Sequence, residues 1–288
     1  MKIYYQDIYD AENNRRQISS KKDYNNENVI ASMNYALSKF NNTFQDTIDV
    51  DDGHPLIIPF GLPRSATTLL TQVIISYFDV GYVDNIIARF WESPIYGIAL
   101  SNALLKEKHN SFSSNYGKTL EISSPHEFSY FWHKWMSIDS LYDLDIERIK
   151  RDTNWIGLSN ILTQMSIEFD KPMVMKGFWP SYVMGGMLKI LPDTFFVYIK
   201  RNPIDVALSL YHARIAYYND PNKWLSMIPP NCDNLLNESW KVQISKQVYY
   251  LNSFYEEQLK KLSEKSFMVI EYEELCLDPV DVMKKIKE

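Results

Sequence analysis

Four side chains suited to holding an anion lie close together in the first quarter of the chain. The segment Gly61 to Thr68, GLPRSATT, carries one guanidinium and three hydroxyl groups within the five residues Arg64 to Thr68. A guanidinium offers parallel N–H donors to phosphate or sulfate oxygens, and hydroxyl groups add further donors. The types and spacing of these residues predict a site for a phosphate or sulfate group.

The elements on either side of this loop would present it to an anion. Residues 55–60 form a short apolar run that predicts a buried strand, and 69–78, LLTQVIISYF, reads as a helix. The start of a helix has N–H groups without intrahelical partners and a positive dipole end, which together attract anions. The alternative is that the Ser and Thr residues only cap this helix. The Walker A pattern with its Gly-Lys pair is missing, which disfavours hydrolysis of ATP or GTP.

A second anion anchor is predicted near Arg201. The run 194–200, TFFVYIK, reads as a buried strand that ends at Arg201, and 203–218 reads as a helix with proline in its first turn. Ser209 follows eight residues after Arg201, so both side chains can reach one ligand at the carboxyl end of the strand. The alternative is that Arg201 pairs with Asp205 and that Ser209 bonds its own helix backbone.

Both segments resemble motifs of one family. GLPRSATTLL resembles the 5'-phosphosulfate loop of sulfotransferases, Pro-Lys/Arg-Ser-Gly-Thr-Thr, and RNPIDVALS resembles their 3'-phosphate motif, Arg-Asn/Asp-Pro-x-Asp-x-x-x-Ser. The chain is identified on this basis as a member of the sulfotransferases that use 3'-phosphoadenosine 5'-phosphosulfate (PAPS), over about residues 55 to 288. The resemblance implies in-line transfer of a sulfuryl group to a hydroxyl, or secondarily an amine, with no metal and with adenosine 3',5'-bisphosphate (PAP) as product. It implies that the donor is held by Gly61, Pro63, Arg64, Ser65, Ala66, Thr67, Thr68, Arg201, Ser209 and Tyr272.

Two departures from the family motif bear on donor binding. Ala66 replaces the usual glycine, and because a positive φ would strain an alanine by about 1 kcal/mol, an ordinary backbone conformation is expected there. Leu69 stands where some members have an aromatic residue, so adenine stacking is left unassigned. The family's glycine-rich basic segment, which closes on the 3'-phosphate, has no counterpart before Glu288.

The catalytic groups are less clear from the sequence. Lys176 matches the lysine that precedes the family's 3'-phosphate motif, where it would stabilise the departing phosphate; the alternative is a strand-end lysine that reaches solvent. Phe178 stands where many cytosolic members have their catalytic histidine. The general base is therefore sought elsewhere, and three candidates are His126, Glu92 and Glu127.

These three candidates have different claims. His126 titrates near neutrality and lies at an expected helix start, where it is the first choice as base or, alternatively, a cap. Glu92 is the second choice, because other family branches use a glutamate after the phosphosulfate loop, but it can also pair with Arg89. Glu127 would orient His126 or act itself. The aromatic segment 211–230, with Tyr217, Tyr218 and Trp224, is expected to wall the acceptor or to be a packed loop.

The wider pattern predicts one α/β domain over residues 1–288. Strands alternating with helices after residue 171 indicate a parallel sheet flanked by helices, P-loop-like, with an N-terminal helical extension at 1–50 and a mainly helical substrate-side insertion at 84–170. The remaining elements are expected as helices at 29–45, 181–190, 203–218 and 238–263, strands at 171–177, 194–200 and 267–270, and a last helix that begins at Asp278-Pro279.

Composition limits the function classes. The net charge is −6, which argues against general attraction to nucleic acid or anionic lipid. The first thirty residues lack a secretion signal, no membrane-length apolar run is present, and the two cysteines lack metal-ligand spacing, so a cytoplasmic enzyme without metal is expected. The expected acceptor is a hydroxyl of a small molecule, lipid or carbohydrate. The alternatives are a non-catalytic PAP- or PAPS-binding module and a P-loop small-molecule kinase.

Overall fold

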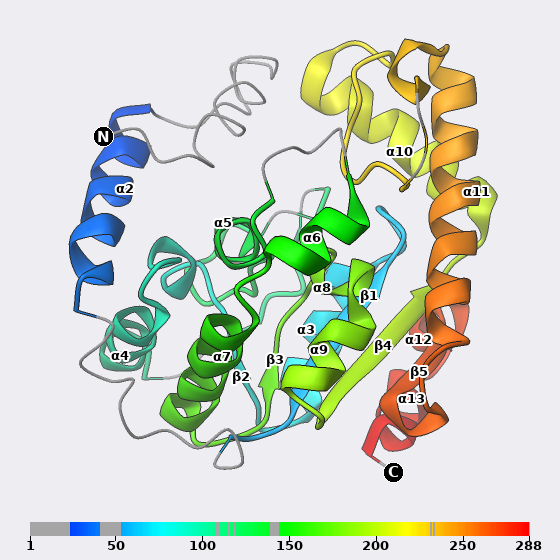
Figure 1. Ribbon diagram of the computed structural model, residues 1–288. Helices are drawn as coiled ribbons and strands as arrows, with labels where there is room; N and C mark the ends of the chain where they lie inside the picture. The colour runs from blue at the N-terminus through cyan, green and yellow to red at the C-terminus, as the bar shows by residue number, and fades with distance from the viewer. Residues whose placement is uncertain are drawn as a thin grey trace.

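A five-stranded sheet forms the centre of the molecule (Figure 1). The computed structural model describes residues 24–40, 53–106, 110–114, 116–117, 119–138, 144–230, 232 and 234–287. The strands are ordered β2-β3-β1-β4-β5, and each pairs with its neighbours in parallel, which confirms the predicted fold class. The strands are β1 (Leu56–Gly61), β2 (Gly81–Tyr82), β3 (Met173–Val174), β4 (Thr194–Lys200) and β5 (Phe267–Glu271).

Helices cover both faces of the sheet, as a buried parallel sheet requires. Figure 1 shows α7, α9 and α11 in front of the strands, with α3 behind them. The helices are α2 (Tyr24–Ser38), α3 (Thr67–Tyr77), α4 (Pro94–Leu104), α5 (Ser129–Trp135), α6 (Ile146–Asp152), α7 (Trp155–Phe169), α8 (Trp179–Tyr182), α9 (Met184–Ile190), α10 (Pro203–Tyr218), α11 (Trp240–Leu259), α12 (Tyr272–Leu277) and α13 (Pro279–Lys287).

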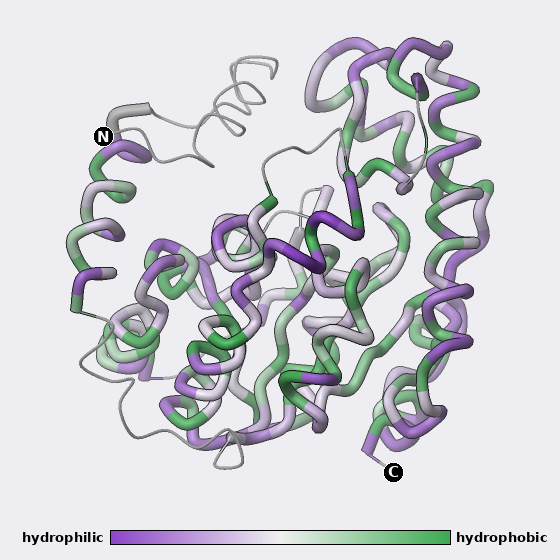
Figure 2. The backbone as a smooth tube through the Cα atoms, viewed as in Figure 1, coloured by the Kyte–Doolittle hydropathy of each residue, from purple (hydrophilic) through white to green (hydrophobic). Residues whose placement is uncertain are grey.

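Side-chain alternation along β4 divides the core into two layers. Phe196 and Tyr198 point into a large, aromatic-rich cluster shared with the insertion and α11, whereas Val197 and Ile199 point into a smaller aliphatic cluster under α3, α12 and α13. In Figure 2 the central strands are mainly green or pale, and purple residues recur along the outer helices. Burial on both faces holds β1 and β4 in register, so the loops at their carboxyl ends start from fixed positions.

The segment between β2 and β3 carries helices joined by irregular stretches, of which the longest lies between α4 and α5. It contributes α4, α5, α6 and α7 to the aromatic core. The N-terminal helix α2 docks on this insertion, because Tyr130 donates a hydrogen bond to Glu27 and Asn34 donates one to the carbonyl of Arg89. Within the described residues, no helix combines the length and apolar character needed to span a membrane.

Several predicted boundaries were wrong. The helix expected at 29–45 runs from Tyr24 to Ser38, and residues 41–45 of that prediction lie outside the described residues. The strand expected at 171–177 pairs as a strand only at Met173–Val174, and the short β2 was not predicted. The helix expected at 181–190 is divided at Val183, whose φ of −133° leaves helical geometry. β4 and α10, by contrast, have the predicted bounds.

Candidate donor and transfer site

The loop between β1 and α3 is shaped by a close approach that only glycine allows. A Cβ on Gly61 would lie 2.5 Å from the Ser65 hydroxyl oxygen and 2.6 Å from the carbonyl oxygen of Ile199 in β4. The loop then turns back on itself, because the Ser65 amide donates to the Leu62 carbonyl at 3.0 Å. Ser65 is thereby folded over the end of the strand, with its side chain inside the loop.

The backbone conformation of Ala66 contradicts the sequence-based expectation. Its φ of 77° and ψ of 27° are left-handed, as is the φ of 74° at Arg64. A left-handed conformation at a residue with a Cβ costs about 1 to 2 kcal/mol, and the loop closure that Gly61 permits imposes it here. Helix α3 begins directly after Ala66, with no side-chain cap. The first amides of α3 therefore lack intrahelical acceptors and remain available to an anion.

Unpartnered donors test whether these residues fit a phosphorylated ligand. Among the described residues, nothing pairs with the buried Ser65 hydroxyl or with the buried Nε of Arg201. Thr67 and Thr68 are also buried at the loop. Buried donors without acceptors are costly, and an anion with several oxygens would satisfy them, so the residues fit a phosphate or sulfate group. Among the described residues, no group of three or more His, Cys, Asp or Glu is placed to hold a metal ion.

The two predicted anchors meet directly. Nε of Arg64 donates to the Ser209 hydroxyl at 3.2 Å, and Nη1 of Arg201 donates to the Arg64 carbonyl at 3.2 Å. The guanidinium of Arg201 also lies over the Tyr272 ring, 4.4 Å from its centroid. These contacts come from β1, β4, α10 and α12, which are distant in sequence. The sequence had left open that Arg201 pairs with Asp205 and that Ser209 bonds its own helix backbone. The contacts of Arg201 and Ser209 with Arg64 take the place of both.

Lys176 is buried between Glu127 and the loop Gly61 to Thr68, which we call the anion loop. Its Nζ donates to the Thr68 hydroxyl at 2.7 Å and to Oε1 of Glu127 at 2.5 Å, and only 5% of its side chain is exposed. The solvent-exposed alternative for Lys176 is therefore wrong. Burial alone would raise the pKa of Glu127, but the charge and hydrogen bond of Lys176 outweigh it, and the pKa lies below its ordinary value. The Glu127 side chain is 37% exposed, so it is partly open to solvent, in contrast to Lys176.

The His126 ring is engaged by the backbone. Its Nδ1 accepts a hydrogen bond from the Phe128 amide at 2.9 Å, while its own amide donates to the Val83 carbonyl at 2.8 Å. A neutral imidazole whose Nδ1 accepts carries its proton on Nε2. The side chain therefore serves the turn before α5, and its basic nitrogen is occupied.

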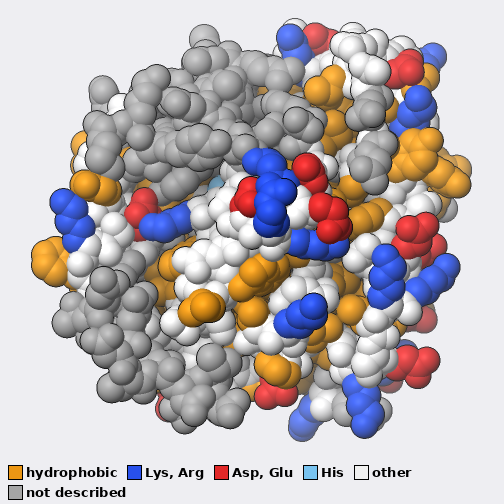
Figure 3. Space-filling model, in the orientation of Figure 1, with side chains coloured by type: hydrophobic (Ala, Val, Ile, Leu, Met, Phe, Trp, Pro, Cys, Tyr) orange, Lys and Arg blue, Asp and Glu red, His pale blue; other side chains and the backbone are white. Residues whose placement is uncertain are grey.

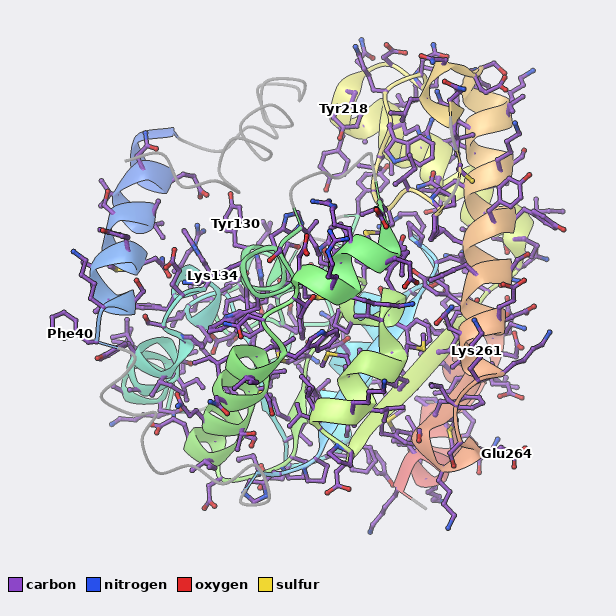
Figure 4. All side chains as sticks on the ribbon, in the orientation of Figure 1. Phe40, Tyr130, Lys134, Tyr218, Lys261 and Glu264 are labelled. Atoms are coloured by element: carbon purple, nitrogen blue, oxygen red, sulfur yellow. The ribbon has the colours of Figure 1, made fainter. Side chains whose placement is uncertain are left out.

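Glu92 contacts helices α5 and α2. Its carboxylate binds Lys134 of α5 at 2.6 Å, and its amide donates to Asn34 of α2 at 2.9 Å. Arg89, the partner expected from sequence, instead binds Glu27 at 3.2 Å. Figure 4 shows Lys134 and Tyr130 between α5 and α2. The structure therefore joins Glu92 to the N-terminal helix and does not bring it to the Thr68 and Lys176 contacts.

Comparison with known proteins agrees with this geometry. A model described as the sulfotransferase family matches residues 55–288. The chain belongs to the sulfotransferase family. The crystal structure of sulfotransferase STF9 from Mycobacterium avium is similar, with a TM-score of 0.54 and 14% identity, covering 88% of this chain and 67% of that one. Sulfotransferase STF1 from Mycobacterium tuberculosis has a TM-score of 0.54 and 13% identity, covering 88% and 70%. These identities support the shared fold alone, and no curated protein gives a significant match.

Aromatic side chains lie close to Arg64 and Lys176. The Arg64 guanidinium lies 5.3 Å from the Tyr116 ring centroid, and the Tyr116 and Tyr217 rings are 6.0 Å apart. Nζ of Lys176 lies 5.8 Å from the Phe178 ring centroid. The sequence indicated Tyr217 as part of an aromatic wall but gave no signal for Tyr116, which lies in an irregular segment after α4.

The rest of segment 211–230 behaves differently from Tyr217. Tyr218 and Trp224 are both buried, and the Arg214 guanidinium lies 5.0 Å from the Trp224 ring centroid. Arg214 is itself buried and bonded to Gln243 and Gln247 of α11, and burial lowers its pKa to about 10. These residues pack the segment against α11, so the packed-loop alternative holds for them.

A groove of about 970 Å³ lies between α10 and α11, beside Arg201. Arg201 and Leu62 border it at one end, and Ile204, Leu208 and Trp240 give it an apolar lining. Figure 3 shows hydrophobic side chains gathered over these helices, while acidic and basic side chains are interspersed elsewhere on the same face. On this face the excess negative charge does not form one continuous field, which agrees with anion binding at a local site.

Proposed function

We propose that this sulfotransferase transfers a sulfuryl group from PAPS to a hydroxyl group of its acceptor, by in-line attack and without a metal. The observation that carries the proposal is the chain of contacts from Thr68 through Lys176 to Glu127. It joins an anion loop to a buried cation and then to an exposed carboxylate. Sulfuryl transfer needs these three functions together, since positioning and electrostatic stabilisation carry most of the catalysis in the related phosphoryl transfers.

The proposed donor contacts divide between its two phosphorylated ends. The α3 amides, Arg64, Ser65, Thr67 and Thr68 bind the 5'-phosphosulfate, in a loop that Gly61, Pro63 and Ala66 shape. Arg201 and Ser209 bind the 3'-phosphate, and Tyr272 supports Arg201 through its ring. The direct contact between Arg64 and Ser209 supports one ligand that spans both groups.

In this proposal, Lys176 and Glu127 act in the transfer step itself. Lys176 donates a hydrogen bond to the oxygen of the departing phosphate, where its charge stabilises the negative charge that develops. Glu127 accepts the proton of the acceptor hydroxyl. Its Oε1 is held by Lys176, which leaves Oε2 as the oxygen proposed to take the proton. The occupied Nδ1 of His126 and the Lys134 partner of Glu92 make both of these weaker candidates for the base.

Calorimetry and a transfer assay together test this function. PAP should bind at least tenfold more tightly than ATP, because ATP lacks the 3'-phosphate that Arg201 would hold. Equal affinity for PAP and ATP would overturn the proposed donor. Transfer of labelled sulfate from PAPS to a mixed panel of hydroxyl compounds should then be detectable.

One alternative is that the protein binds PAP or PAPS without catalysing transfer. Phe178, at the position of the catalytic histidine of many relatives, favours a non-catalytic PAP-binding module. Tight PAP binding without transfer to any acceptor would support that alternative. The position of Glu127 beside Lys176 argues against it, because a binding module needs no exposed carboxylate at that point.

A further inference from the structure

Three aromatic side chains, Tyr116, Tyr217 and Phe178, form what we call the aromatic frame. They lie beside the reactive cluster, which consists of Arg64, Thr68, Lys176 and Glu127. Tyr116 lies against Arg64, Tyr217 lies against Tyr116, and Phe178 lies beside Lys176, at ring distances of 5.3, 6.0 and 5.8 Å. The three rings come from the segment after α4, the end of α10 and the turn before α8. Three distant parts of the chain therefore bring aromatic side chains to the two cations of the proposed transfer.

Partly exposed and buried side chains lie next to each other in this cluster. Thr68 and Lys176 are buried, with exposed fractions of 7% and 6%. Tyr116 and the Glu127 side chain are each 37% exposed. We therefore expect an acceptor at the Thr68 and Lys176 contact to meet the Tyr116 ring and the Glu127 side chain. Planar rings bind well against such surfaces, in stacked or edge-to-face geometry.

The chemistry of Glu127 favours an acidic hydroxyl. Lys176 holds its pKa below the ordinary value despite burial, so the carboxylate is a weak base. A weak base assists most where the proton is easily released, and a phenolic hydroxyl has a pKa of about 10, as tyrosine does, far below the pKa of water. The rings and the base thus favour the same kind of acceptor.

We propose that the acceptor is a phenol, held against Tyr116 and Tyr217 with its hydroxyl at Glu127. This inference rests on the proposed sulfuryl transfer. The phenolic oxygen forms a bond to sulfur as the bridging bond between sulfur and the 5'-phosphate oxygen breaks. The electron pair of that broken bond stays on the phosphate, and the phenolic proton passes to Glu127. The products are an aryl sulfate and PAP.

A matched pair of acceptors tests the proposal. 4-Ethylphenol and 4-ethylcyclohexanol have similar size and differ in ring planarity and hydroxyl acidity. With PAPS as donor, kcat/KM should be at least 100-fold higher for the phenol. Tyr116→Ala should raise the KM for the phenol about tenfold, in the range of a lost aromatic contact. Tyr116→Phe should restore the wild-type KM, and Tyr249→Ala, an exposed tyrosine on α11, is the matched control.

PAP affinity, measured by calorimetry on the same proteins, separates the two proposals. If PAP binds and 4-ethylcyclohexanol is sulfated as well as the phenol, the phenol proposal is wrong and the sulfuryl transfer stands. If PAP binds and neither acceptor reacts, the phenol proposal is also overturned. If PAP does not bind, the proposed function itself fails. If Tyr116→Ala tightens PAP binding and leaves the phenol KM unchanged, the ring covers the donor loop instead of the acceptor, which again contradicts the inference.

Discussion

The donor side and the acceptor side of this sulfotransferase are built in different ways. The donor residues follow the carboxyl ends of β1 and β4, which pair over their whole length up to Gly61 and Ile199. The proposed acceptor residues Tyr116 and Glu127 come from irregular segments between α4 and α5. The sheet fixes the donor geometry through buried backbone pairing, whereas the acceptor geometry depends on side-chain contacts. One fold can therefore keep a single donor while its acceptor surface changes.

Lys176 connects the two sides. It leaves the sheet just after β3, touches Thr68 on the donor side, and holds Glu127 on the acceptor side. If this division is correct, substitutions on the two sides of Lys176 will change different kinetic and binding constants. Donor-side changes will act on nucleotide affinity, and acceptor-side changes will act on turnover and on acceptor KM.

The largest effect is expected from Glu127→Gln. Loss of a general base lowers kcat by roughly 10²- to 10⁴-fold, whereas PAP affinity should change by less than about threefold, since Glu127 lies on the acceptor side. Steady-state kinetics and calorimetry measure the two quantities. His126→Gln is the matched control and should retain most of the turnover. If His126→Gln loses as much kcat as Glu127→Gln, the assignment of the base returns to the histidine.

Arg201→Met is expected to act on the donor side and to lower nucleotide affinity. Hydrogen bonds from a charged group contribute about 1.5 to 3 kcal/mol each, so PAP affinity should fall roughly 10- to 100-fold. Adenosine 5'-phosphosulfate lacks the 3'-phosphate, and its affinity should change little in the same variant. Calorimetry with both ligands gives the comparison. An equal loss for both would mean that Arg201 supports the loop through the Arg64 carbonyl and does not bind the 3'-phosphate.

The pH dependence of kcat/KM tests the link through Lys176. Burial raises the pKa of Glu127, but Lys176, His126 and Arg64 lower it, and the net pKa lies below the ordinary value. A base works only when ionised, so activity should persist below the usual carboxylate range and be lost as pH falls through the depressed pKa. In Lys176→Met, burial remains without its main counter-charge, and the acid limb should move to higher pH whatever the loss in the plateau rate. If the acid limb of the kcat/KM profile does not move, the ionisation of Glu127 does not control the rate.

Sequence patterns located the strands and helix starts of the proposed donor side for a physical reason. The anion loop and the Arg201 anchor each lie within a few residues of a buried strand, so local apolar runs and helix-start signals locate them. The acceptor side depends on long-range contacts that no local pattern contains. Glu92 was paired with a neighbour three residues away, but Lys134, 42 residues away, binds it instead. Tyr116 reaches Arg64 only because the insertion folds back over α3.

Ala66 is the one donor-side residue for which the local argument failed, and Ala66→Gly tests why. The expected ordinary φ gives way to a left-handed one, because loop closure at Gly61 and the start of α3 outweigh the preference of a single alanine. Ala66→Gly removes this strain and should stabilise the protein by up to about 1 kcal/mol, which raises Tm by roughly 2 °C for a chain of this size. Thermal unfolding followed by circular dichroism measures the shift. Ala207→Gly, in the middle of α10, is the matched control and should destabilise by about 1 kcal/mol. If both variants lower Tm, the donor loop holds no strain at this position, and its rigidity comes from the sheet alone.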